Sequence, residues 1–309
     1  MSSPVASPRR AARAAAASRR PRRRAWSGLL WVLPAAVAYG TFVLYPLWET
    51  VRYSFFDWDG IGVATFSGAA NYLRVLTDDE LRLSIVHAFV LIVFFSFLPI
   101  LVALFVAAVL RDMRSRTGTT VARVVLFIPQ VLPLVASGIA WTWMYSTTGP
   151  INQVLGALGL GDLARPWLAD FTTALPAVGI IGTWVALGFC VVLLSAGIGN
   201  IDPALYEATA LDGAGWWQQF RHVTIPGLRS EITICLTVTT ISALSSFDLV
   251  YVSTSGGPGY QTMVPAVEIY RLVFIENRVG QGSALAVVLT VLVLLIVGLL
   301  QRIGRTDES

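Results

Sequence analysis

Residues 84–110 read SIVHAFVLIVFFSFLPILVALFVAAVL and contain no Arg, Asp or Glu. As an α-helix this stretch would rise about 40 Å, which exceeds the roughly 30 Å of hydrocarbon in a bilayer. The composition of the whole 309-residue chain also indicates a membrane protein. Of its residues 55% are hydrophobic and 13% are charged, whereas soluble domains are about 25% charged. The sequence therefore excludes a soluble globular fold and predicts an all-α integral membrane protein.

Six apolar segments of this kind follow one another along the chain. Each is long enough to cross a bilayer as a helix. We therefore predict six transmembrane helices, at about 27–54, 84–110, 121–146, 173–199, 231–252 and 282–302. Proline lacks the backbone N–H and bends helices, so we expect bends in the first three spans. The prolines concerned are Pro34, Pro46, Pro99, Pro129 and Pro133.

Arginines are distributed unevenly between the two predicted sides of the membrane. Sixteen lie in the N-terminal tail, the second and fourth connections and the C-terminal end, and five lie in the opposite loops. By the positive-inside rule the side with sixteen is the cytoplasm, so both termini are expected there. We predict a disordered Arg-rich cytoplasmic tail at 1–25, a transmembrane domain at 26–303 and a cytoplasmic C-terminus at 304–309. The tail could instead be an export signal, but it has no convincing cleavage site. It could also be a nucleic-acid arm, but no aromatic residues accompany it, so we expect no nucleic-acid partner.

The composition also limits the chemistry that this chain can perform. All 22 basic residues are arginine, and a Walker A loop needs a lysine, so ATP must be hydrolysed elsewhere if transport is uphill. The two cysteines and the two histidines lack the spacing of a metal site, and no cluster of titratable groups indicates catalysis. We therefore expect a protein that is not an enzyme, with no metal and no cofactor bound by this chain.

The fourth connection, residues 200–230, carries the most informative pattern. Asp202 followed by Pro203 is typical of a helix N-cap and first turn, and Gly213 stands where a left-handed residue would end that helix. We therefore predict a short helix between these two points. A second short helix through Trp216, Trp217 and Phe220 is expected to lie on the membrane surface until Pro226.

Residues in this connection resemble the cytoplasmic EAA loop of binding-protein-dependent ABC importer permeases. The matching residues are Glu207-Ala208-Thr209, Asp212-Gly213-Ala214, Phe220 and Thr224-Ile225-Pro226. Thr209 and Ile225 depart from the family pattern, which has alanine and leucine there. The resemblance implies that the loop between spans four and five contains a coupling helix that docks on an ATPase subunit. Its implied coupling residues are Glu207, Ala208, Leu211, Asp212 and Gly213.

Other segments are similar to the carbohydrate branch of that family, the maltose and glycerol-3-phosphate type. They are residues 54–58 (SFFDW), Asn71-Tyr72, Ile128-Pro129 with Trp141, Gly149 and Asn152, and residues 255–259 (SGGPG). This resemblance implies a bacterial cell-membrane permease that imports a sugar or a similar solute. It also implies a second homologous permease subunit, two cytoplasmic ATPase subunits that bind ATP, and an extracellular solute-binding protein.

The substrate path is predicted less specifically than the coupling loop. A carboxylate near an apolar span is usually functional or solvated, so Asp248 is a candidate for substrate contact or for simple exposure. Ser245 lies beside it, and Gln130 either contacts substrate or bonds the carbonyls freed by neighbouring prolines. Trp141 could stack on a sugar, although an aromatic belt at the interface suits its position better.

Two other function classes fit the composition alone. A self-powered secondary transporter would need ion-coupling residues within the spans and often shows repeated spans. Only Asp248 is a candidate, it is poorly placed, and the chain shows no convincing internal repeat. An integral-membrane enzyme would need clustered reactive groups. Among importers, polyols, glycerol phosphate and other small solutes such as an amino acid or an oxyanion remain alternatives to a sugar. The absence of arginines deep in the spans favours a neutral solute.

Overall fold

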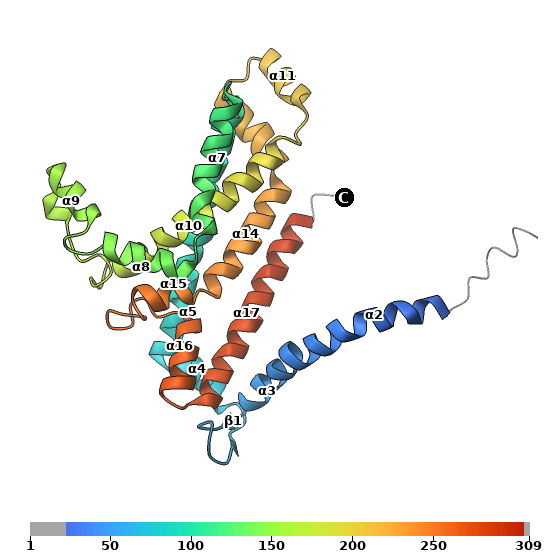
Figure 1. The fold of residues 1–309 in the computed structure, drawn as a ribbon, viewed down its shortest axis with the longest axis vertical. Coiled ribbons are helices and arrows are strands. Elements are labelled where there is room, and N and C mark those ends of the chain that lie inside the picture. The colour runs from blue at the N-terminus through green and yellow to red at the C-terminus, as the bar shows by residue number, and fades with distance from the viewer. Residues whose placement is uncertain (1–22, 306–309) are drawn as a thin grey trace, which may run out of the picture. The chain divides into compact units, whose positions relative to one another are not determined.

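The computed structural model describes residues 23–305. Nearly all of the predicted tail, 1–25, and most of the predicted C-terminal segment, 304–309, lie outside the described residues. The chain divides into two units, residues 1–50 and 51–309, and each is described by itself. In the first unit, α2 (Arg23–Tyr39) continues through a π-helix, η1 (Gly40–Leu44), into α3 (Tyr45–Tyr53) (Figure 1). The part from Trp31 to Tyr53 is apolar and long enough to cross a membrane.

The second unit is built almost entirely of helices. In chain order its elements are β1 (Phe56–Asp57), β2 (Thr65–Phe66), α4 (Ala70–Thr77), α5 (Asp79–Ile92), η2 (Val93–Phe97), α6 (Leu98–Asp112), α7 (Arg116–Val131), α8 (Leu134–Met144), α9 (Pro150–Ala157), η3 (Gly161–Leu163), α10 (Ala174–Ile198), α11 (Pro203–Leu211), α12 (Trp216–Gln219), η4 (Phe220–Thr224), α13 (Ile225–Gly227), α14 (Arg229–Leu244), α15 (Asp248–Ser253), α16 (Pro265–Tyr270), η5 (Arg271–Ile275) and α17 (Val279–Arg305). The all-α expectation is corrected by one short antiparallel pair, in which Phe56 lies opposite Phe66.

Within the described residues, four helices are long and apolar enough to span a membrane. Three of them belong to the second unit, namely Asp79–Asp112, Ala174–Ile198 and Val279–Gly304. The predicted third span, 121–146, is not straight, because α7 and α8 meet at 97°. Pro133 explains this break, since it cannot donate a helical hydrogen bond and disfavours helical backbone at Leu132. If α7 and α8 count as one span the total is five, and six spans stay a prediction.

The predicted fifth span, 231–252, is wrong as one continuous helix. α14 ends at Leu244 after 16 residues, or about 24 Å of rise, and α15 begins at Asp248. Neither proline nor glycine lies between them, but Ser245 and Ser246 do. Serine hydroxyls compete for backbone hydrogen bonds and disfavour helix interiors, which is consistent with a break here.

Several prolines are accommodated by π-turns instead of sharp kinks. The π-helices η1, η2 and η4 each end two residues before a proline, at Pro46, Pro99 and Pro226. In η2 the Leu98 N–H bonds to the Val93 carbonyl, and Pro99 has no N–H to continue the pattern. The Phe94 carbonyl accepts from the Thr183 hydroxyl of α10 at 2.6 Å instead. The second span therefore continues through Pro99 as one 34-residue helix.

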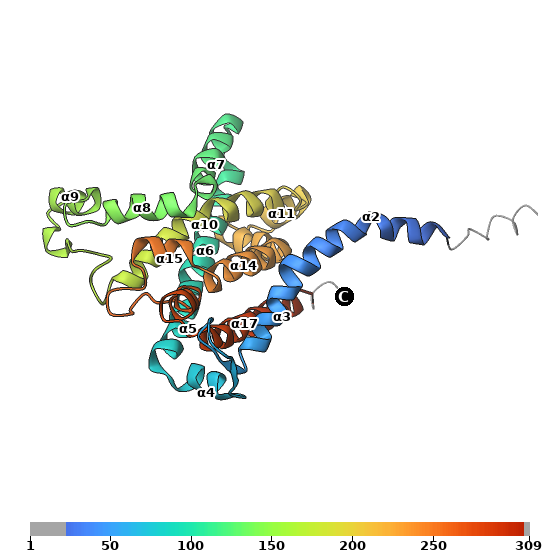
Figure 2. The ribbon, with the colours of Figure 1, turned by 60° about the horizontal axis from the view of Figure 1, so that its bottom comes forward.

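α10 is the central helix of the second unit. It packs on α6, α7, η2 and α14, and α14 packs in turn against α17 (Figures 1 and 2). Both large apolar clusters contain α10 residues, Val178 and Ile181 in one and Val191 and Leu194 in the other. Gly188 sits where α10 crosses α7, and a Cβ there would overlap the Leu126 carbonyl oxygen. Close approach of backbones through small residues is typical of packed membrane helices.

Candidate functional site

A cavity of about 490 Å³ lies where the two broken helices meet. Its wall includes the break between α7 and α8, the break between α14 and α15, and parts of η2 and α10. α8 and α15, the segments that follow the two breaks, lie side by side in both views (Figures 1 and 2). Discontinuous membrane helices free backbone groups, which are tolerated where they line a cavity, and substrate sites of transporters are often built there.

The cavity combines an apolar wall with a row of polar side chains. The polar residues lining it are Gln130, Thr239, Ser242, Ser245, Ser246 and Asp248. Aromatic rings of Phe95, Phe189 and Phe247 also line it. The Ser246 hydroxyl is buried and makes no hydrogen bond within the described chain. Its oxygen is almost fully covered by protein atoms, so Ser246 borders the cavity without presenting the hydroxyl to it.

Three of the four predicted substrate-path residues are brought together in this cavity. Gln130, Ser245 and Asp248 all line it, although Gln130 comes from the end of α7 and the others from the distant α14–α15 break. Trp141 does not line it. Its ring packs against Tyr145 and Trp184, with centroids 5.2 and 5.5 Å away. Their roles in substrate contact stay predictions.

The floor of the cavity is set by the π-helix η2. Phe95 lies on this turn, and a Cβ at Gly182 of α10 would overlap the Phe95 ring. The neighbouring Ser96 hydroxyl bonds to the Thr240 hydroxyl at 3.0 Å and also to that of Thr239. These interhelical bonds hold η2 against α14 and so fix the backbone that carries Phe95. The sequence did not single out Phe95 or Ser246, because neither carries a recognisable motif.

Replacing Gly182 with alanine should make the cavity smaller. The added methyl group displaces the Phe95 ring, a flexible side chain that lines the cavity beside Gly182. If the predicted substrate path runs through this cavity, uptake of solute should fall severalfold while the amount of inserted protein is retained. Uptake measured in proteoliposomes tests this, and the double variant Gly182→Ala, Phe95→Leu should recover part of the loss. Equal uptake by the single variant and the parent protein would contradict the assignment of this floor.

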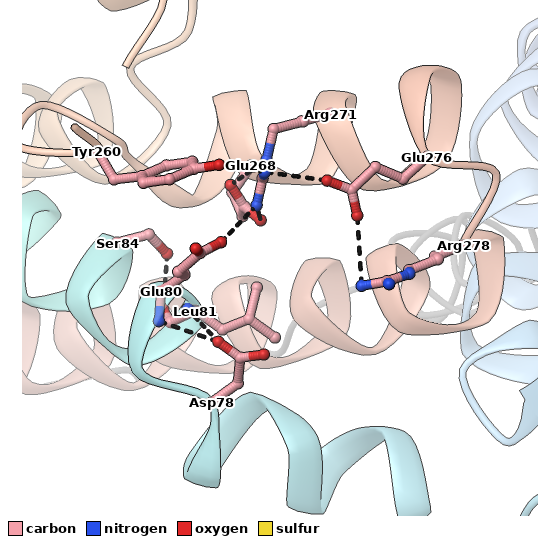
Figure 3. A network of polar contacts seen from close by, with 9 residues as sticks. All are labelled: Asp78, Glu80, Leu81, Ser84, Tyr260, Glu268, Arg271, Glu276 and Arg278. Carbon is pink, nitrogen blue, oxygen red and sulfur yellow. Dashed lines mark hydrogen bonds and ion pairs between the residues drawn. The ribbon is translucent and has the colours of Figure 1, made fainter. Parts of the chain in front are cut away.

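A network of charges holds α16 and η5 against the first turn of α5 (Figure 3). Arg271 of η5 forms a two-point ion pair with the fully buried Glu268 of α16, at 2.7 and 3.0 Å. The same guanidinium bonds to Glu80 of α5, the Tyr260 hydroxyl and Glu276, each at 2.9 Å. Burial raises the pKa of the Glu268 carboxyl, and its bonds to Arg271 only partly oppose this.

This network makes Arg271 the joint between α16–η5 and the beginning of the second span. A buried ion pair contributes little net stability, but removing one partner leaves the other charge buried and unpaired. The arginine therefore fixes the position of α16 and η5 relative to α5. The segment that Arg271 holds is the continuous helical stretch formed by α16 and η5, residues 265–275.

The predicted helix in the fourth connection is confirmed as α11. The Asp202 carboxylate caps it by accepting from the Ala204 N–H at 2.9 Å. At its other end Gly213 has φ of +80°, the left-handed region that favours glycine. Bonds from Gly213 N–H to Ala210 and from Ala214 N–H to Thr209, at 3.1 and 3.0 Å, complete a Schellman motif.

All five predicted coupling residues are exposed on this segment. They are Glu207, Ala208, Leu211, Asp212 and Gly213. Leu211 exposes 89% of its surface and Leu205, on the same helix, exposes 53%. Exposed apolar residues grouped on a short, doubly capped helix are typical of a docking surface. Figure 1 shows α11 at the end of the second unit opposite the β1–β2 hairpin.

Comparison with known proteins identifies the chain's family. Residues 88–304 match the model described as the binding-protein-dependent transport system inner membrane component. A probable ABC transporter permease of Bacillus subtilis is 32% identical, over 91% of this chain and 96% of that protein. A trehalose/maltose transport system permease of Thermococcus litoralis is 33% identical, over 92% and 95%.

Two further proteins are more distant. A diacetylchitobiose uptake permease of Streptomyces coelicolor is 29% identical, over 88% of this chain and 80% of that protein. The fold matches a chain of a bacterial ABC transporter for alginate with a TM-score of 0.77 at 21% identity, covering 93% of this chain and 98% of that one. The relatives are transport proteins and not enzymes. With 217 of its 309 residues matched by the family model, the chain belongs to the inner-membrane components of binding-protein-dependent transport systems.

Proposed function

We propose that this chain is the permease subunit of an ABC importer for a neutral sugar, and that the cavity between the broken helices is part of the sugar's path. The cavity's chemistry is the observation that carries this proposal. Hydroxyl, amide and carboxylate groups alternate there with aromatic rings, a combination that suits a polyhydroxylated ring with one apolar face. Named relatives that transport trehalose, maltose and diacetylchitobiose support the same substrate class.

The charge of the cavity favours a neutral solute over an acidic one. Asp248 is the only charged residue among the described residues that line it, and no arginine does. A carboxylate accepts hydrogen bonds from sugar hydroxyls strongly but repels anions. Glycerol phosphate or an acidic sugar is therefore the less suitable occupant.

The family of the chain supports the assembly that we propose. The chain has six spans with both termini in the cytoplasm and pairs with a second, homologous permease subunit, because one such subunit is too small to enclose an oligosaccharide path. Two cytoplasmic ATPase subunits bind ATP, and α11 docks on one of them. An extracellular solute-binding protein delivers the sugar. This chain itself binds no cofactor.

Within α11 the proposed docking residues have different tasks. Leu211 and Ala208 supply an apolar surface that fits a cleft, and Glu207 adds a charged contact. Asp212 and Gly213 end the helix sharply and give it a fixed length. A helix that passes motion between two bodies needs shape and stiffness, and needs no reactive group.

Replacing Asp248 with asparagine tests the proposed path. The change keeps the size of the side chain and removes a charged acceptor, so uptake of a neutral sugar should fall about tenfold. The measurement is ATP-driven uptake into proteoliposomes that contain the complete transporter and its solute-binding protein. Maltose, trehalose, diacetylchitobiose, glycerol 3-phosphate and a uronic acid oligomer form the panel. Asp162→Asn, an exposed outer-loop change, is the matched control and should have no effect.

Two outcomes would contradict the proposal. Faster transport of glycerol 3-phosphate than of every sugar by the parent protein would overturn the substrate class. Uptake by this polypeptide alone, without ATP or ATPase subunits, would instead indicate a secondary transporter.

A further inference from the structure

The inner end of the second span is attached directly to the segment that follows α11. Asp112, the last residue of α6, accepts a hydrogen bond from the indole N–H of Trp216 at 2.7 Å. The neighbouring Arg111 is 2.8 Å from the same carboxylate. The Arg111 guanidinium also stacks on the ring of Tyr206 in α11, with its central carbon 3.8 Å from the ring centroid. Two adjacent residues of one helix thus hold both α11 and α12.

Tyr206 and Trp216 are themselves held by further contacts. The Tyr206 hydroxyl bonds to the Thr224 hydroxyl at 3.0 Å, and its carbonyl accepts from Gln219 at 3.3 Å. The Trp216 ring stacks on Phe220 and meets Phe105 of α6 edge-on. α11 is therefore held through Tyr206, while Leu211 and Glu207 stay exposed.

The helix that holds α11 also reaches the cavity and the outer network. α5, η2 and α6 form one continuous helix from Asp79 to Asp112, about 51 Å long. Its middle places Phe95 in the cavity wall, and Glu80 near its outer end bonds to Arg271. A continuous helix is stiff along its axis, so a displacement at Asp112 is transmitted to both places.

We propose that Arg111 and Asp112 are positioning residues that join α11 to the second span, so that movement of the docked α11 is passed to the cavity. This inference rests on the proposed docking of α11 on an ATPase subunit. The joint fixes the angle of α11 relative to the second span and makes no contact with ATP or sugar. Without it, ATP is still hydrolysed, but less of the motion reaches the transport path.

If Arg111 and Asp112 had a purely structural role, replacing them would lower the amount or the thermal stability of the permease. The proposal predicts otherwise. The side chains of Arg111 and Asp112 are 26% and 42% exposed, and exposed ion pairs contribute little to stability. Replacing either residue should therefore leave the amount and thermal stability of the permease unchanged. Coupling, measured as ATP hydrolysed per sugar imported, should change instead.

The test uses the complete transporter in proteoliposomes with its solute-binding protein. Asp112→Ala and Trp216→Phe each remove the same hydrogen bond, and Trp216→Phe keeps the ring stacking. We expect each to raise the number of ATP molecules hydrolysed per sugar about threefold or more. The double variant should be no worse than the stronger single variant, because both act through one bond. Asp112→Asn, whose amide oxygen can still accept from Trp216, should restore most of the coupling.

The control is the ion pair Asp79–Arg82, which is also exposed, lies at the other end of the same helix and measures 2.6 Å. Asp79→Ala should leave the ratio unchanged. The inference is overturned if Asp112→Ala keeps the parental ratio, if the two single effects add, or if the only change is lower stability. Co-purification of the ATPase subunits distinguishes an error in this inference from an error in the proposed docking of α11. If the Leu211→Glu variant still binds the ATPase subunits, the proposed docking role of α11 is wrong. If Leu211→Glu loses these subunits but Asp112→Ala has no effect on the ratio, only the proposed joint is wrong.

Discussion

Replacing Gly188 with alanine is expected to destabilise the permease, although alanine favours helices more than glycine does. The new Cβ would overlap the Leu126 carbonyl oxygen and lie 2.7 Å from the Phe127 Cα. These are backbone atoms of α7, so no side-chain rotation can relieve the clash and the two helices must separate. Overpacking of this kind costs about 1–3 kcal/mol. The measurement is the thermal unfolding temperature and the yield of the purified protein.

Gly298 in α17 provides the matched control. It also lies within a predicted span, but a Cβ there meets no atom within 4 Å. Gly298→Ala should therefore leave stability unchanged or raise it by up to about 1 kcal/mol through helix propensity. Equal behaviour of the two variants would contradict the close crossing of α10 and α7. A larger residue at Gly188, such as leucine, should prevent accumulation of folded protein altogether.

Leu211→Glu should abolish uptake while the permease itself stays folded. Leu211 is 89% exposed, so glutamate is readily tolerated in the isolated chain. In the proposed complex the same carboxylate is buried in an apolar cleft without a partner, and this weakens docking by about a hundredfold or more. Co-purification of the ATPase subunits and ATP-driven uptake are the two measurements.

Ile61→Glu is the matched control for this change. Ile61 is 90% exposed and lies in the hairpin loop between β1 and β2, at the end of the second unit away from α11 (Figure 1). The control should retain the ATPase subunits in full. Retention of these subunits by Leu211→Glu as well would show that α11 is not their docking site.

Local sequence was sufficient to predict α11, because its limits are set by neighbouring residues. The Asp202 cap, Pro203 in the first turn and the left-handed Gly213 all act within a few residues of the helix ends. The apolar spans through 84–110, 173–199 and 282–302 were predictable for a similar reason, since hydrocarbon thickness dictates their length and composition. The break after Leu244 was missed, because serines weaken a helix without stopping it.

The sequence by itself determined that the chain contains apolar segments long enough to cross a membrane and that most of the chain is helical, and the fourth connection resembles an EAA loop. Only the tertiary structure decided that Gln130 meets Asp248 in one cavity, and that Asp112 bonds to Trp216 across 104 positions of the chain. Helix caps and hydropathy act over a few residues and can be identified in the chain itself. Contacts between distant side chains depend on how helices cross, and these crossings follow from the fit of many surfaces at once, as at Gly188 against α7.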